Sequence, residues 1–121
     1  MKKQSIIKSQ SYAKRVINLY VKEFKNALGI FETKHCTYDI EYDDIKSTES
    51  WKVITIKSSL HLFNSVELET AFEVAERAKK NYKDVYYTIT ASTYQGTYLK
   101  LAEPVIEISF PVYPQEKAGE K

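Results

Sequence analysis

The fold is decided by residues 64–94, which read NSVELETAFEVAERAKKNYKDVYYTITASTY. Asn64, followed three residues later by Glu67, has the pattern of a helix N-cap with a capping box. Apolar residues then recur at steps of three and four, the spacing that lines one face of an α-helix. The predicted buried stripe consists of Leu68, Ala71, Phe72, Ala75, Ala78 and Tyr82. Residues 85–94 alternate instead at the period of two that is typical of a half-buried strand.

The same two patterns occur in the first half of the chain. Residues 6–28 have the helical spacing, with a predicted buried stripe of Ile6, Ala13, Ile17, Tyr20, Phe24 and Leu28. Gly29 follows this stripe and is expected to end the helix. Residues 35–42 and 51–58 are predicted strands, joined by a polar loop over residues 43–50. Pro104 interrupts the pattern before a last predicted strand over residues 105–112.

The predicted element order is therefore α-β-β-α-β-β. Two helices packed on one face of a four-stranded, mostly antiparallel sheet would bury every apolar face, which gives an α+β fold. We expect residues 1–114 to form a single domain and residues 115–121 to form a flexible C-terminal tail. The helices and the sheet are expected to share one core that contains Ile17, Phe24, Phe72, Ile89 and Ile108.

The composition favours a cytoplasmic protein. Cys36 is the only cysteine, so no disulfide can form within the chain, which suits a reducing compartment. No stretch approaches the roughly 20 apolar residues that a membrane-spanning helix needs. The apolar run at Ile6 and Ile7 is too short for a signal peptide, because Lys8 follows at once. We therefore expect no membrane partner.

The sequence predicts no catalytic residue. It contains no Gly-rich phosphate loop, nucleophile elbow or paired-histidine motif. Because His35 and Cys36 are adjacent in a predicted strand, their side chains should point to opposite faces and cannot act as a pair. Asp39, Glu41 and Asp43 lie on the same predicted face as His35, but strand residues two apart are separated by about 7 Å, so the row cannot enclose an ion without ligands from another element. We expect a protein that is not an enzyme and has no cofactor and no metal.

The ten tyrosines are the most unusual feature of the composition. Tyrosine and threonine side chains of residues 85–94 would lie on the sheet face away from the helices, and tyrosine and tryptophan are enriched in protein interfaces. We therefore predict a binding module that self-associates or binds a protein partner through this face. The predicted interface residues are Trp51, Val53, Tyr86, Thr88, Thr90 and Tyr94. Tyrosine and threonine are also good strand formers, so a purely structural role fits them equally.

A basic segment supports a different function. Residues 1–30 contain seven Lys or Arg residues against Glu23 alone. The predicted nucleic-acid-binding residues form one stripe opposite the apolar face of the first helix, namely Lys8, Lys14, Arg15, Lys22 and Lys25. An exposed helix face also needs charge to remain soluble, so the stripe is equally explained as a solvated surface with no ligand.

Two alternatives to the protein-binding module follow. The first is a nucleic-acid-binding accessory protein that uses this stripe, and the abundance of Lys, Ile and Tyr would suit the AT-rich genome of a phage or mobile element. The second is a small ligand-binding domain or enzyme with a pocket between the sheet and the helices.

Overall fold

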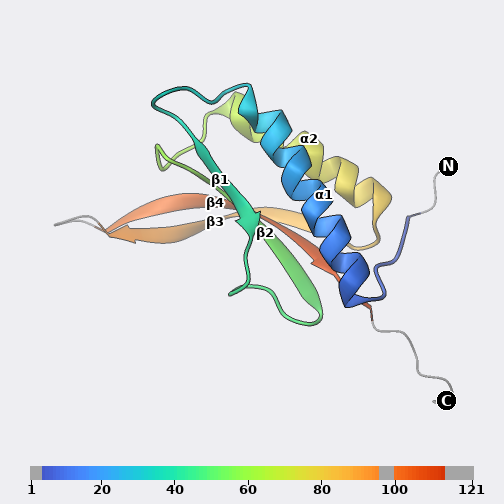
Figure 1. Cartoon of the computed structure of the whole chain (residues 1–121). Helices are drawn as coiled ribbons and strands as arrows, with labels where there is room; N and C mark the ends of the chain where they lie inside the picture. Colours follow the sequence, from blue (N-terminus) through green and yellow to red (C-terminus); the bar gives the residue numbers. More distant parts are fainter. Residues whose placement is uncertain (1–3, 96–99, 114–121) are drawn as a thin grey trace, which may run out of the picture.

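The computed structural model of the protein describes residues 4–95 and 100–113. Within these ranges, residues 91–95 and 100–102 are described by their backbone alone. The elements are α1 (Gln10–Gly29), β1 (Tyr38–Tyr42), β2 (Trp51–Ser58), α2 (Ser65–Asn81), β3 (Tyr86–Gln95) and β4 (Lys100–Pro111). Both helices lie over one face of the sheet (Figure 1). The predicted α+β fold and its α-β-β-α-β-β order are confirmed. The predicted tail, residues 115–121, lies outside the described residues.

The four strands have the order β1-β2-β4-β3, and every neighbouring pair is antiparallel. The last strand, β4, therefore lies between β2 and β3, which makes β1 and β3 the two edges of the sheet. β3 pairs with β4 along its whole length, from Tyr86 opposite Ser109 to Gln95 opposite Lys100. This hairpin extends beyond the area that the helices cover (Figure 1).

The hydrophobic core lies between the central strands and the two helices. The strands contribute side chains that are fully buried, namely Ile54, Ile56, Ile106, Ile108 and Phe110. The helices contribute the second set, which is Ala13, Val16, Ile17, Tyr20, Phe24 and Leu28 from α1 and Ala71, Val74, Ala75 and Ala78 from α2. The predicted helix faces are thus largely correct, with Val16 and Val74 as buried residues that the predicted stripes omitted.

The prediction that the first helix includes Ile6 was wrong. Ser9 is the N-cap, and its side-chain oxygen accepts a hydrogen bond from the Tyr12 N–H at 3.1 Å. The segment before it is extended and held by backbone hydrogen bonds, including one from the Tyr113 N–H to the Ile7 carbonyl. Neighbouring side chains of an extended segment point to opposite sides, so Ile7 is buried and Ile6 is 39% exposed.

The predicted strand over residues 35–42 was too long at its start. Thr33 and Cys36 exchange backbone hydrogen bonds, and Oγ1 of Thr33 accepts from the N–H groups of His35 and Cys36. These bonds close a loop, so the strand begins only at Tyr38. The argument that placed His35 and Cys36 on opposite faces of a strand therefore does not apply.

The second helix begins as predicted. Asn64 accepts from the Glu67 N–H at 2.8 Å, and the Glu67 carboxylate accepts from the Asn64 N–H at 2.8 Å, which completes the capping box. Glu67 is itself buried, and the Tyr38 hydroxyl donates a further hydrogen bond to its carboxylate. The capping box thus also joins α2 to β1.

The placement of Ile89 in the core was wrong. Ile89 shares the helix-side face of β3 with Tyr87, and Tyr87 packs against Phe72 of α2 with ring centroids 5.0 Å apart. Ile89 lies further along the strand and is 42% exposed. Because β3 is an edge strand, neither helix covers it beyond Tyr87. Phe72 is likewise only half-buried.

The two helix phenylalanines should therefore differ in their effect on stability. Phe24 is fully buried, so Phe24→Ala should lower the free energy of unfolding by about 3 to 5 kcal/mol. Phe72→Ala should cost roughly half as much, since Phe72 is already partly in water. Urea denaturation of both variants would measure the difference. Equal losses would contradict this assignment of the core.

Candidate functional site

The sheet face away from the helices is closed in part by its own side chains. Trp51 on β2 and Tyr86 on β3 lie on either side of β4, yet their rings meet edge to face with centroids 5.3 Å apart. The rings must therefore pass over β4. Small residues beneath such side chains are buried although no helix covers them, as for Val53, Thr55, Val105 and Ser109.

One salt bridge and one histidine–carboxylate contact also lie on this face, and both use glutamates of β4. Lys46, from the loop between β1 and β2, forms a salt bridge with Glu107, whose side chain is 15% exposed. The Thr90 hydroxyl lies 3.4 Å from the same carboxylate. Nδ1 of His61 lies 3.1 Å from the Glu103 carboxylate, which is 12% exposed. A partner docking flat on this face would have to displace these contacts.

The predicted interface residues therefore fall into different environments. Tyr86 is 50% exposed, Thr88 is exposed and Thr90 is half-buried, and all three belong to the edge strand β3. Trp51 is half-buried behind Tyr86, and Val53 is 6% exposed, so Val53 offers almost no contact area. Tyr94 belongs to β3, but its side chain lies outside the described residues. The accessible members of the set thus lie at the sheet edge.

The edge formed by β3 differs in chemistry from the edge formed by β1. The sequence of β3, YYTITASTYQ, contains no charged residue, glycine or proline. β1 has only five residues, and Asp39 and Glu41 expose carboxylates there. β3 pairs with β4 alone, so along its other edge the backbone groups have no strand partner within the described part of the chain. A long uncharged edge of this kind is a template for pairing with another strand.

The helix side of β3 is polar near α2 and apolar beyond it. The Tyr87 hydroxyl donates a hydrogen bond to the Glu76 carboxylate at 2.6 Å. This hydrogen bond is the main cause, and burial the second cause, that raises the pKa of Tyr87 to about 12. The phenol is protonated at neutral pH, as an unperturbed tyrosine also is, and its hydrogen bond joins β3 to α2. Ile89 is the next side chain on this face and remains exposed.

The five predicted nucleic-acid-binding residues are all exposed, but they do not form a single stripe. Lys14 and Lys25 lie on the side of α1 that faces β1, since each lines a hollow together with β1 residues. Arg15 and Lys22 lie opposite the core by helical geometry, and Lys8 precedes the helix. Among the described residues, none of the five forms a salt bridge.

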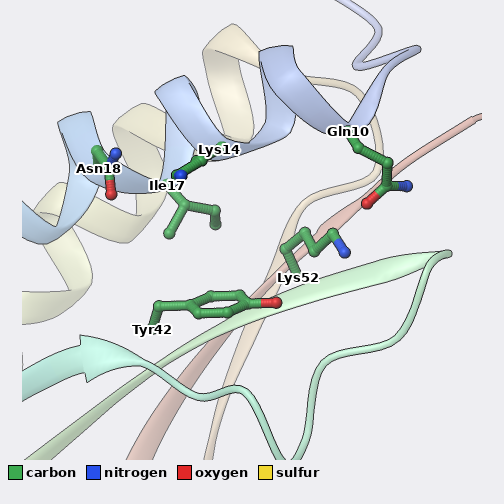
Figure 2. Close-up of a pocket in the computed structure, with 6 residues that line it drawn as sticks. All are labelled: Gln10, Lys14, Ile17, Asn18, Tyr42 and Lys52. Carbon is green, nitrogen blue, oxygen red and sulfur yellow. The ribbon is translucent and has the colours of Figure 1, made fainter.

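A cavity of about 300 Å³ lies between α1 and the sheet on the β1 side. Figure 2 shows the Tyr42 ring across this cavity from Lys14 and Ile17, with Lys52 between Tyr42 and Gln10. Asn18 completes the lining. A pocket between the sheet and a helix was one of the sequence-based alternatives, but its residues could not be identified, because the register between α1 and β2 has no local sequence signal.

The thiol of Cys36 is half-buried and lies 4.0 Å from the Glu67 carboxylate, to which it donates a weak hydrogen bond. His35 is exposed in the loop before β1. Within the described residues, no group of three or more His, Cys, Asp and Glu side chains is placed to hold a metal ion.

Comparison with known proteins gives no relative: no family model matches the chain, and neither does any curated protein or solved structure. Neither helix in the described part of the chain combines the length and the apolar character that a bilayer-spanning helix needs. Any functional conclusion must therefore come from the surfaces described above.

The aromatic contact over β4 can be tested with the single tryptophan. Tyr86→Ala should expose Trp51, shift its fluorescence emission to longer wavelength and cost roughly 1 kcal/mol of unfolding free energy. Tyr42→Ala is the matched control, because Tyr42 is also a partly exposed strand tyrosine but is not a ring partner of Trp51. An unchanged emission spectrum in Tyr86→Ala would show that the two rings do not touch.

Proposed function

We propose that the protein is a non-enzymatic interaction module that self-associates by pairing β3 with the β3 strand of a second copy. The observation that carries this proposal is the long edge strand Tyr86–Gln95, which contains no charged residue or proline, pairs with β4 in a regular register and is covered along its outer edge by no other strand among the described residues. Soluble proteins usually guard such edges with charged residues, proline, bulges or a covering element. A second strand would supply partners for outward backbone groups in the first half of β3.

The side chains of β3 are complementary to themselves. An antiparallel pair centred on Thr88 would place Thr88 opposite Thr88 of the second copy and Tyr86 opposite Thr90 of the second copy. Threonine pairs and aromatic pairs with β-branched residues stabilise neighbouring strands by about 0.2 to 1 kcal/mol each. A two-fold axis brings identical surfaces together, so a strand that is complementary to itself can form a dimer without a different protein as partner.

The same register accounts for the exposure of Ile89. On the helix side of the sheet, it would place Ile89 opposite Tyr87 of the second copy. Ile89 is 42% exposed in the single chain, and Tyr87 is already fixed against Phe72. Pairing would remove the exposed isoleucine from water, at a gain of roughly 25 cal/mol for each Å² of apolar surface buried.

The charges of α2 also favour an antiparallel pair. α2 lies beside β3, so pairing at β3 would bring the α2 helices of the two copies next to each other in opposite directions. One face of α2 has Glu69 and Glu73 in its first half and Lys80 in its last turn, whereas Arg77 points towards α1 and pairs with Glu23 there. In the antiparallel arrangement the acidic part of each helix faces the basic part of the other. A parallel arrangement would oppose like charges.

A charge placed on the edge should prevent self-association. Ile89→Lys should convert the protein from a dimer of 28.2 kDa, twice the 14.1 kDa of the chain, into a monomer. Ile45→Lys is the matched control, since Ile45 is 95% exposed in the loop between β1 and β2, away from β3. Size-exclusion chromatography with light scattering would measure both masses, and circular dichroism would verify that each variant folds.

Two results would overturn the proposal. A wild-type protein that remains a monomer at submillimolar concentration would exclude self-association. An Ile89→Lys variant that stays folded and dimeric would show that the dimer uses another surface.

Charge reversal on α2 tests the arrangement of the helices. Glu69→Lys and Lys80→Glu should each weaken the dimer by about two- to fivefold, because each change opposes like charges across the axis. The double variant restores opposite charges and should recover most of the wild-type affinity. Sedimentation equilibrium at low ionic strength would measure the four affinities. Additive losses in the double variant would contradict an antiparallel α2 pair.

A further inference from the structure

We propose that the cavity between α1 and the β1–β2 edge is a binding site for a nucleotide unit, which is a planar base that carries a phosphate. This inference is independent of the β3 dimer, because the cavity lies at the β1–β2 end of the sheet and β3 forms the opposite edge. The site is built from α1, the last residue of β1 and the second residue of β2.

The cavity has two apolar walls that fit a flat group. Tyr42 is on the helix side of β1, and its ring lies across the cavity from Ile17 of α1 (Figure 2). The Tyr42 side chain is 37% exposed, and its ring belongs to none of the aromatic pairs between residues whose side chains are described. An aromatic ring with a free face is a stacking platform for a base. Ile17 is only 3% exposed, so it closes the inner end of the cavity and would add little contact area to the other face of the base.

Two lysines supply positive charge to the same cavity. Lys14 reaches it from α1 and Lys52 from β2, where Lys52 is half-buried on the helix side of the sheet. Among the described residues, neither lysine has a carboxylate partner. Lysine binds phosphate as a point charge, and two uncompensated ammonium groups beside an apolar slot favour an anion.

The amides of Gln10 and Asn18 add hydrogen-bonding groups at the rim. Nε2 of Gln10 donates to the Glu49 carbonyl at 2.9 Å, which fixes the side chain. The amide oxygen of Gln10 is left on the side of Lys52 (Figure 2), where it can accept from an amino group of a base. A plain anion would use the lysines and amide N–H groups but not the ring. A nucleotide unit would use all of them.

The volume of the cavity is consistent with a single unit. At about 300 Å³, it falls at the lower end of the range for small-ligand pockets. A free nucleotide and the terminal nucleotide of a single strand share this chemistry. They differ in what lies beyond the cavity, since only a strand would continue along α1 towards Lys25 and Lys22.

The experiment is a titration of the ¹⁵N-labelled protein with adenosine monophosphate, adenosine, inorganic phosphate and a six-residue oligodeoxyadenylate. We expect adenosine monophosphate to shift the amide signals of Ile17, Tyr42 and Lys52, and to bind at least tenfold more tightly than adenosine or phosphate. Lys52→Gln should weaken this binding by about tenfold, because a charge-assisted hydrogen bond is lost. Tyr42→Leu should weaken it similarly by removing the stacking ring.

The matched control is Lys22→Gln, which removes the same charge from α1 outside the cavity. It should change the affinity for adenosine monophosphate by less than twofold. An oligonucleotide that binds no more tightly than the mononucleotide would identify the free nucleotide as the ligand, and a gain that Lys22→Gln removes would identify a strand.

Three results would overturn the site. No shift at these residues with any nucleotide would exclude it. An equal loss of affinity in Lys22→Gln and Lys52→Gln would show binding by general electrostatic attraction to α1. Equal affinities for phosphate and adenosine monophosphate would show that the ring wall plays no part. The variants' melting temperatures, expected to match the wild type, verify that lost affinity is not lost folding.

Discussion

The rest of the structure depends on the antiparallel pairing of β2 with β4. This register places Ile54 opposite Ile108 and Ile56 opposite Ile106, and all four side chains are fully removed from water beneath the helices. Burial of an isoleucine side chain contributes roughly 1.5 to 3 kcal/mol, so these four residues supply a large share of the hydrophobic stabilisation of the sheet. Because β4 occupies the centre, β1 and β3 are left as the two edges.

The two edges differ, and each difference leads to one of the proposed sites. β1 ends at Tyr42 while β2 continues under the start of α1, which leaves the space that Tyr42, Lys14 and Lys52 surround. β3 is twice as long as β1, with ten residues against five, and continues past the helices with Ile89 exposed. One edge therefore offers a cavity lined by a tyrosine ring and two lysines, and the other offers a long strand whose outer edge pairs with no strand among the described residues.

Local sequence patterns identify most of the fold, because helix periodicity, strand alternation and capping are encoded within a few residues. The capping box of Asn64 and Glu67 and the strand over residues 51–58 are examples. The sequence could not place Ile89, since its exposure depends on β4 entering between β2 and β3. The cavity was equally hidden, because Lys14, Tyr42 and Lys52 come from three separate elements. The uncharged composition of β3 is visible in the sequence, but it gains meaning only once β3 is known to be an edge.

The most direct test of the account is amide hydrogen exchange, measured for individual residues of β3 and β1 at low and at high protein concentration. If β3 pairs with a second copy, its outward N–H groups between Tyr86 and Thr90 should become protected as the concentration rises, while those of β1 should exchange at an unchanged rate. Rapid exchange of the outward β3 amides at every concentration would show that this edge remains free and would contradict the account.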